Sequence, residues 1–271
     1  DVEHASKLIT DRTKAIIPVH YAGLSCDMDP IYTLAGNHGI KVIEDAAHAL
    51  SSSYNQQIIG SLDSDATVFS FYANKTITTA EGGMVVTANK DLAENFRIAR
   101  HHGIDKNALE RATTNSAFYD VVAQGYKYNL TDIAAAIGIE QLKKLPEILK
   151  RREQLAAIYL DELKSLPLIL PQGPKTGDIH PWHLFVIRVR EDANIDRDTV
   201  IKELFSRGIQ TSIHYTPIHK HPYWKSLYSF EESDFPFAEK IFKSIISIPL
   251  YTRMTNSEQE YVIQSLHEVL N

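Results

Sequence analysis

Apolar runs alternate with amphipathic stretches along the first part of the chain, a pattern typical of a parallel α/β fold. Runs rich in β-branched and aromatic residues predict strands at 15–19, 41–44, 66–71 and 84–87. The stretch that begins at Asp29-Pro30 predicts a helix through His38, which Gly39 ends. Because two of the strands flank this helix, we expect a right-handed parallel unit with Asp45 at the carboxyl end of its second strand.

The same signals predict the remaining elements. Helices are expected at 90–102, 147–163, 198–207, 237–244 and 257–270, strands at 184–189 and 209–213, an irregular surface segment at 105–125 and a Pro/Gly-rich linker at 167–177. A further helix is expected from Thr131 until Pro146 interrupts it, with Thr131 or Asp132 as its N-cap. The order of elements predicts an α/β protein with a mostly parallel sheet in a large domain at residues 1–145. A linking helix and a smaller α+β domain are expected at 146–271.

Composition narrows the class of protein. The chain has 271 residues, 44% of them apolar and 23% charged, so we expect a globular protein with a substantial core. No stretch resembles a membrane span or a signal peptide, and the single cysteine, Cys26, agrees with a reducing compartment, so a cytoplasmic protein is expected. The net charge of −6 argues against general nucleic-acid binding and leaves a small anionic substrate open.

Lys75 is the first candidate for chemistry. It follows the apolar run 66–71 and precedes the Gly82-Gly83 turn, among small and β-branched residues. Desolvation at the end of a buried strand disfavours the ammonium and prepares the amine to form a Schiff base with a carbonyl. The alternative, common for a lone lysine, is a side chain that extends from a loop to solvent.

Asp45 offers the anion that such chemistry needs. If Lys75 holds an aldehyde cofactor such as pyridoxal 5′-phosphate (PLP), a carboxylate beside the ring nitrogen keeps that nitrogen protonated. At about 4 Å and an effective dielectric of about 20, this contact is worth roughly 4 kcal/mol. His48 could contact the ring if residues 45–49 begin a helical turn, and Ser70 could donate to a phosphate, although both residue types are often structural.

Several motifs occur in order along nearly the whole chain. They are Pro18-Val19-His20-Tyr21-Ala22-Gly23, Ile43-Glu44-Asp45-Ala46-Ala47-His48-Ala49, Phe69-Ser70-Phe71 with Lys75 and Glu81-Gly82-Gly83, Gly125-Tyr126-Lys127-Tyr128-Asn129-Leu130-Thr131-Asp132, and Trp182-His183-Leu184-Phe185. Together they resemble the DegT/StrS-type PLP-dependent nucleotide-sugar aminotransferases. The resemblance is strongest to enzymes that aminate C4 of a UDP-4-keto sugar, in making 4-amino-4-deoxy-arabinose or the pseudaminic acid precursor.

The resemblance implies a fold and a set of roles. The fold would be the PLP-dependent transferase fold type I, which is aspartate aminotransferase-like. Lys75 would bind the cofactor covalently and move the proton, and Asp45 would pair with the pyridinium nitrogen. His48 would contact the ring near its phenolic oxygen, and Ser70 would bind the phosphate. Asn129 would reach the cofactor phosphate of a neighbouring subunit, which implies a homodimer with shared sites, and glutamate would be the amino donor. The family also places phosphate-binding residues upstream of Asp1, so we expect the N-terminal part of the large domain to be missing.

Further residues are candidates for the substrate. The segment 214–223 holds three histidines, but its prolines prevent a regular helix that would align ligands, so no metal is expected. The resemblance instead implies a loop beside the sugar-nucleotide pocket, where His214, Tyr215 and Lys220 could face the diphosphate or the sugar. Tyr126 and Lys127 are either core and surface residues or substrate contacts.

Two other functions stay open. Relatives that dehydrate sugars carry histidine in place of the lysine, so Lys75 argues against a dehydratase. The alternative outside the enzymes is a shortened chain that no longer catalyses and serves as a binding or oligomerisation module. The pair Arg151-Arg152 is expected on a solvated helix face.

Overall fold

The computed structural model describes residues 1–106, 111, 113 and 117–271. Residues 107–110, 112 and 114–116, which belong to the segment expected to be irregular, lie outside the described part. The chain divides into two compact units. Residues 1–146 and 174–181 form the first, and residues 147–173 and 182–271 form the second.

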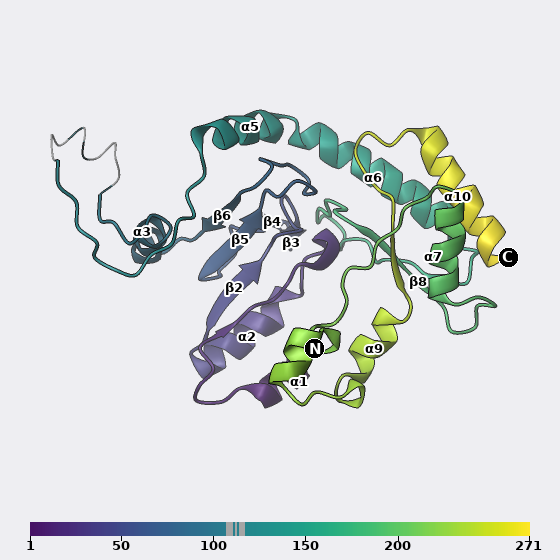
Figure 1. The fold of residues 1–271 in the computed structure, drawn as a ribbon, viewed down its shortest axis with the longest axis horizontal. Coiled ribbons are helices and arrows are strands. Elements are labelled where there is room, and N and C mark those ends of the chain that lie inside the picture. Colours follow the sequence, from purple (N-terminus) through teal and green to yellow (C-terminus); the bar gives the residue numbers. More distant parts are fainter. Residues whose placement is uncertain (107–110, 112, 114–116) are drawn as a thin grey trace. The chain divides into compact units, whose positions relative to one another are not determined.

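A four-stranded mixed sheet forms the centre of the first unit, in the order β1-β2-β5-β6 (Figure 1). Its strands are β1 (Ala15–Ile16), β2 (Lys41–Asp45), β5 (Ala66–Ser70) and β6 (Gly83–Val86). β1 with β2 and β2 with β5 pair in parallel, whereas β5 and β6 pair antiparallel with Ser70 opposite Gly83. The parallel β1–helix–β2 unit is confirmed, and the Lys75 segment joins the one antiparallel pair of this sheet.

Helix α2 (Met28–His38) covers this sheet through a regular apolar face. Met28, Ile31, Leu34 and Ala35 are buried, and α2 contacts β2. Gly39 ends the helix with φ of 64°, in the left-handed region that glycine tolerates best. The chain then enters β2, which places Asp45 at the carboxyl end of that strand.

The first unit contains several shorter elements. They are α1 (Val2–Leu8), the 3₁₀ turn η1 (Tyr21–Gly23), the β3 (Ser53–Tyr54) and β4 (Gln57–Ile58) hairpin, α3 (Lys90–Ala99) and α5 (Asp132–Lys143). Thr131 caps α5 by accepting the Ala134 amide, as expected. The prediction that α3 reaches His102 is wrong, because the backbone of residues 99–102 bonds to Tyr126 and Tyr128 instead of continuing the helix.

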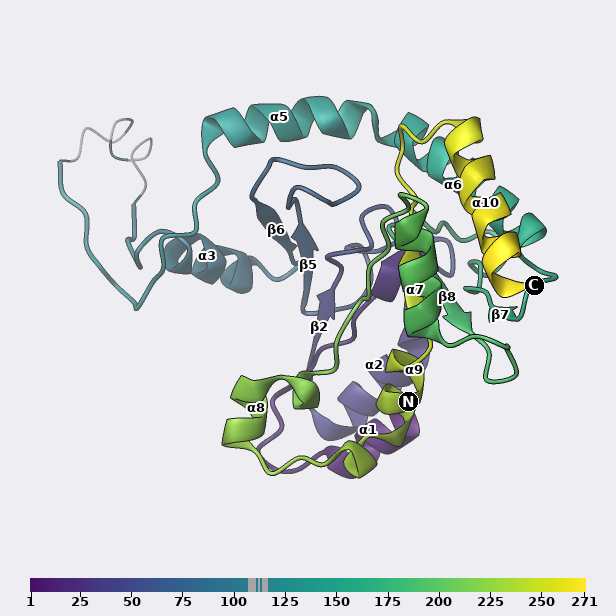
Figure 2. The ribbon, with the colours of Figure 1, turned by 45° about the vertical axis from the view of Figure 1, so that its right-hand side comes forward.

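The second unit packs helices on a three-stranded antiparallel sheet, β7-β8-β9. Its elements are α6 (Leu145–Glu162), β7 (Leu168–Ile169), β8 (Phe185–Val189), α7 (Arg197–Ser206), η2 (Ile218–Lys220), α8 (Pro222–Leu227), η3 (Glu232–Asp234), α9 (Pro236–Phe242), β9 (Ile245–Ile248) and α10 (Asn256–Leu270). Figure 2 shows α7 and α10 side by side, and they contact one another. The fully buried residues Tyr159, Phe185, Leu204 and Leu266 lie in the core of this unit.

Two sequence predictions fail in the second unit. Residues 209–213 form no strand, since only Ser212 bridges to Ser247, and β9 takes the central pairing with β8. Arg152 is not on a solvated face, because its side chain is buried and donates to the carbonyls of Trp182, His183 and Leu250. Arg151, half-buried, donates to the Met254 carbonyl. Among the helices of the described residues, none is long and apolar enough to cross a membrane.

Candidate active site

Lys75 lies in the connection between β5 and β6, and hydrogen bonds hold this connection in place. The Lys75 amide donates to the Tyr72 carbonyl at 3.0 Å. Further along, the Thr78 hydroxyl donates to the Phe71 carbonyl at 3.2 Å and the Thr79 hydroxyl to the Glu81 carbonyl at 2.7 Å. The threonines that follow Lys75 therefore fold the segment back onto the end of β5.

Glycines allow this connection to pack closely. A Cβ at Gly82 would lie 2.3 Å from Thr79 Oγ1, and a Cβ at Gly83 would lie 2.9 Å from the Phe69 carbonyl oxygen. Gly138 of α5 faces the same threonine, since its Cβ would lie 2.9 Å from Thr79 Cγ2. The two glycines of the Glu81-Gly82-Gly83 motif are thus explained by the close approach of the Thr79 side chain to Gly82 and of the Phe69 backbone to Gly83.

The amine of Lys75 is partly withdrawn from water. Burial lowers its pKa below the ordinary value, and the charge of Asp45 opposes this shift. Within the described part of the chain, the ammonium makes no hydrogen bond or ion pair. An amine with a lowered pKa and without a competing partner is suited to nucleophilic and proton-transfer chemistry.

Asp45 is fixed by its backbone. Its amide donates to the Pro18 carbonyl at 2.9 Å, and its carbonyl accepts the His20 amide at 3.0 Å. On the side chain, Oδ1 accepts the Ala47 amide at 3.0 Å. The carboxylate therefore has a defined orientation at the end of β2, close enough to act on the pKa of Lys75.

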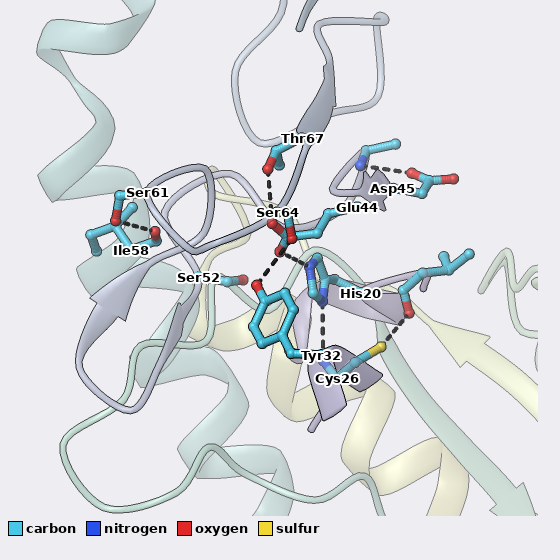
Figure 3. A network of polar contacts seen from close by, with 12 residues as sticks. His20, Cys26, Tyr32, Glu44, Asp45, Ser52, Ile58, Ser61, Ser64 and Thr67 are labelled. Carbon is cyan, nitrogen blue, oxygen red and sulfur yellow. Dashed lines mark hydrogen bonds and ion pairs between the residues drawn. The ribbon is translucent and has the colours of Figure 1, made fainter. Parts of the chain in front are cut away.

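A buried polar network lies beside Asp45 (Figure 3). Neither Glu44 nor His20 has any side-chain exposure, and Glu44 Oε2 lies 2.7 Å from His20 Nε2. The Thr67 hydroxyl donates to Glu44 Oε1 at 2.8 Å. Burial would raise the pKa of Glu44, but the hydrogen bonds from His20, Thr67 and Ser64 outweigh it and lower that pKa.

The structure places His48 and Ser70 near the same strand ends. Residues 46–49 form a single turn, not the start of a helix, so that premise of the prediction is wrong. His48 is buried, and its Nδ1 accepts the Ala22 amide at 3.3 Å. The Ser70 hydroxyl accepts the Tyr72 amide at 3.3 Å at the start of the Lys75 connection. The roles predicted for His48 and Ser70 stay predictions.

Tyr126, Lys127 and Asn129 are exposed and lie before α5. The Tyr126 and Tyr128 rings stack with centroids 5.1 Å apart, and Lys127 bridges to His101 through the backbone. Asn129 lies between this pairing and the α5 N-cap. The predicted substrate and phosphate contacts of these residues stay predictions.

His214, Tyr215 and Lys220 belong to the second unit. His214 Nδ1 lies 2.7 Å from the Ser247 hydroxyl, and the His214 and Tyr215 rings meet edge to face. Lys220 is paired with Glu232 and Glu239, the latter at 3.0 Å. The Lys220 charge is thereby largely neutralised, which weakens the hypothesis that it faces a diphosphate.

The side chains around Lys75 fit PLP by their chemistry. A poorly solvated amine suits the aldehyde, a carboxylate suits the ring nitrogen, and the Ser70 hydroxyl suits a phosphate oxygen. Asp45 and Lys75 come from neighbouring strands of one sheet, at its carboxyl-end edge. The fold and this donor set define a PLP-dependent enzyme of the aminotransferase type.

The chain belongs to the DegT/DnrJ/EryC1/StrS aminotransferase family, whose family model matches residues 1–267. It is 41% identical over 265 residues to the spore coat polysaccharide biosynthesis protein SpsC of Bacillus subtilis, covering 97% of this chain and 68% of that protein. The family is PLP-dependent, and its members are enzymes.

Solved structures of sugar aminotransferases match the fold of this chain over nearly its whole length. A putative sugar aminotransferase from Streptococcus pneumoniae, Spr1654 in its PMP form, matches with a TM-score of 0.91 and 33% identity over 99% of this chain and 72% of its own. Helicobacter pylori PseC, an aminotransferase involved in the biosynthesis of pseudoaminic acid, matches with a TM-score of 0.90 and 31% identity. The match covers 100% of this chain and 70% of PseC. The protein is therefore a sugar aminotransferase by family, with an aminotransferase-like PLP fold.

Sequence reasoning missed the partners of Glu44. His20 lies within the Pro18-Val19-His20 motif and Thr67 within a strand that was predicted, yet neither carried a signal of its own. Their convergence depends on the strand pairing that sets Thr67 opposite Glu44. A polar residue inside each of two predicted buried strands was the available hint.

Proposed function

We propose that this protein transfers an amino group from glutamate to a nucleotide-linked keto sugar, at C4 of a UDP-4-keto hexose or pentose, in making a cell-surface polysaccharide or glycan. The observation that carries the proposal is the partly buried Lys75 amine, whose pKa is lowered and which feels the charge of Asp45, in a chain of a sugar aminotransferase family. The single cysteine supports a cytoplasmic reaction.

Each residue has a defined task in this proposal. PLP, when bound, supplies the electron sink for proton removal next to nitrogen. Lys75 anchors the cofactor and then moves a proton as a free amine, for which its lowered pKa is suited. Asp45 holds positive charge on the ring nitrogen, Ser70 binds the phosphate, and the buried His48 supports the ring.

The names of the relatives support the choice of substrate. SpsC is named for spore coat polysaccharide biosynthesis, and PseC is named as an aminotransferase of pseudoaminic acid biosynthesis. A nucleotide carrier, glutamate and the C4 position follow from the resemblance of motifs and stay part of the proposal. Tyr126, Lys127, His214, Tyr215 and Lys220 remain the candidate substrate contacts, with Lys220 the weakest for the reason given above.

We further propose a homodimer with shared active sites. The outer side chains of α5, including Ile133, Ile137 and Leu142, are exposed, with Ile133 78% accessible. Exposed apolar side chains grouped on one helix favour an interface with a second copy. Asn129 precedes α5 and is exposed, which supports its proposed reach to the partner's cofactor phosphate.

Covalent capture tests the enzyme assignment. Borohydride reduction of PLP-loaded protein should abolish the visible absorbance and leave the label on the peptide that contains Lys75. Lys75→Ala should lower kcat by at least about 10³-fold while cofactor still binds noncovalently. Lys90→Ala, an exposed lysine at the start of α3, is the matched control and should keep activity. Cofactor uptake with the label elsewhere, or full turnover by Lys75→Ala, would refute the role of Lys75.

A mixing experiment tests the shared site. In a mixed dimer of Lys75→Ala and Asn129→Ala protomers, one site would contain the native lysine and the partner's native asparagine. Activity should therefore rise after the two variants are mixed and re-equilibrated. If each subunit forms its own site, mixing should give the average of the two separate activities.

A substrate screen separates the remaining functions. UDP- and dTDP-linked 3-keto and 4-keto sugars are incubated with PLP-loaded protein and glutamate, and the products are analysed by mass spectrometry. An amino sugar with matching 2-oxoglutarate supports transamination, whereas a dehydrated sugar would support the dehydratase alternative. Failure to take up PLP would favour a binding or oligomerisation module.

A further inference from the structure

Glu44 is fully buried, yet His20, Thr67 and Ser64 hold it as a carboxylate. His20 comes from the segment that follows β1, and its Nε2 lies 2.7 Å from Glu44 Oε2. Thr67 comes from β5, and its hydroxyl donates to the other oxygen of Glu44 at 2.8 Å. The single carboxylate thus ties the segment after β1 to β5 across β2 (Figure 3).

His20 holds Glu44 and Asp45 together. While its side chain contacts Glu44, its backbone amide donates to the Asp45 carbonyl at 3.0 Å. Because side chains alternate along a strand, Glu44 and Asp45 point to opposite faces of β2. The buried contact on one face therefore fixes the strand end that presents Asp45 on the other.

Thr67 connects the same carboxylate to the strand that leads to Lys75. Thr67 lies directly opposite Glu44 in the pairing of β2 with β5, and β5 ends at Ser70. Loss of this hydrogen bond would leave the buried Glu44 carboxylate with one donor fewer, and the strand ends would shift so that the carboxylate could find another donor. The spacing of Asp45 and Lys75 would change with them.

The protonation of the pair follows from its geometry. The Cys26 amide donates to His20 Nδ1 at 3.0 Å, and a protonated Nδ1 cannot accept it. We take His20 as neutral with its proton on Nε2 toward Glu44. Tyr32, whose hydroxyl lies 3.0 Å from Ser64, is the titratable group that α2 brings to this network.

We infer that Glu44 is a positioning residue, which with His20 and Thr67 sets the spacing between Asp45 and Lys75. This inference rests on the proposed roles of Asp45 and Lys75. It goes beyond them because the contacts of Glu44 are with His20 and Thr67, so that Glu44 would act through the strand ends.

The pH dependence of Lys75 reactivity tests the inference on the full chain freed of cofactor. Acetylation of Lys75 by acetic anhydride is followed by peptide mass spectrometry as a function of pH, and the midpoint reports the pKa of the amine. Because Asp45 raises that pKa, a wider spacing should move the midpoint down. The variants are Thr67→Val, Thr67→Ser, Glu44→Gln and Asp45→Asn, with Asp178→Asn as a destabilising control elsewhere in the first unit.

We expect Thr67→Val to lower the midpoint by about half a pH unit, which is roughly a three-fold change in reactive amine below the midpoint. Thr67→Ser, which keeps the hydroxyl, should restore the wild-type midpoint, and Glu44→Gln should lower it at least as far as Thr67→Val. Asp178→Asn should lower thermal stability without moving the midpoint. If Glu44→Gln does not fold, the Thr67→Val and Thr67→Ser pair still decides.

The outcomes separate the inference from the function on which it rests. A shift in Asp45→Asn, with none in Thr67→Val and Glu44→Gln, would overturn the positioning role and leave the proposed function standing. No shift in Asp45→Asn would overturn the pairing of Asp45 with Lys75 itself. An equal shift in Asp178→Asn would mean that any loss of stability moves the midpoint, which would also overturn the inference.

Discussion

Replacing Arg152 by methionine should destabilise the second unit by about 3 kcal/mol. This value is the difference between the free energy lost with the hydrogen bonds of the guanidinium and the free energy regained when a buried charge is removed. The guanidinium donates at 2.8–3.2 Å to the carbonyls of Trp182, His183 and Leu250. Loss of a charged donor costs about 2 kcal/mol for each carbonyl, or roughly 6 kcal/mol in all. Burial lowers the pKa of Arg152 from 12.5 to about 10, and relief of that burial returns roughly 3 kcal/mol. Methionine keeps the apolar contacts of the stem.

Tryptophan fluorescence in urea provides the assay. Both tryptophans, Trp182 and Trp224, lie in the second unit, and Trp182 is buried. A Trp224→Phe background leaves Trp182 as the single reporter beside Arg152. Lys150→Met, an exposed neighbour on α6, is the matched control and should change stability by less than about 0.5 kcal/mol. Equal stabilities of Arg152→Met and Lys150→Met would refute the reasoning that these hydrogen bonds outweigh the burial of charge.

Two further predictions concern the first unit. Gly138→Ala should be about 1 kcal/mol more favourable in a Thr79→Ser background than in the wild type, since serine removes the methyl group that the new Cβ would meet at 2.9 Å. A double-mutant cycle by thermal unfolding measures this coupling, and additivity would contradict the packing of α5 on the Lys75 connection. For Asp178, burial raises the pKa, but hydrogen bonds from Gln56, Ser53 and Asn55 lower it below its ordinary value of 3.8. This stabilisation is present above that value and is lost as pH falls through the lowered pKa, so Asp178→Asn should differ from wild type at pH 6 and converge with it in acid. A constant difference across that pH range would contradict the assignment.

Local signals in the sequence were enough for the elements that place Asp45. Gly39 ended α2 and Thr131 capped α5 as expected, because these positions depend on backbone geometry within one turn. Asp45 was likewise set at the end of β2 by the apolar run before it. The sequence could not separate β9 from the helix before it, since an apolar run without a turn signal suits either element.

Contacts between distant residues lay beyond local reasoning. Arg152 lies within a run of consecutive polar residues, 150–154, and its burial depends on carbonyls about thirty or more positions away along the chain. Glu44 was visible as half of an acidic pair, but its pairing with Thr67 depends on the register of β2 with β5. The antiparallel course of β6 also depends on register and carried no marker of its own in the sequence.

The antiparallel course of β6 has a consequence for how the site forms. β5, the Lys75 connection and β6 make a hairpin, whose contacts close a short loop, whereas Asp45 joins the sheet through parallel pairing with distant strands. Short loops close faster than long ones. In pulse-labelled hydrogen exchange during refolding, we therefore expect the amides of β5 and β6 to gain protection before those of β2. The lysine would then be in its hairpin before the carboxylate that acts on it arrives.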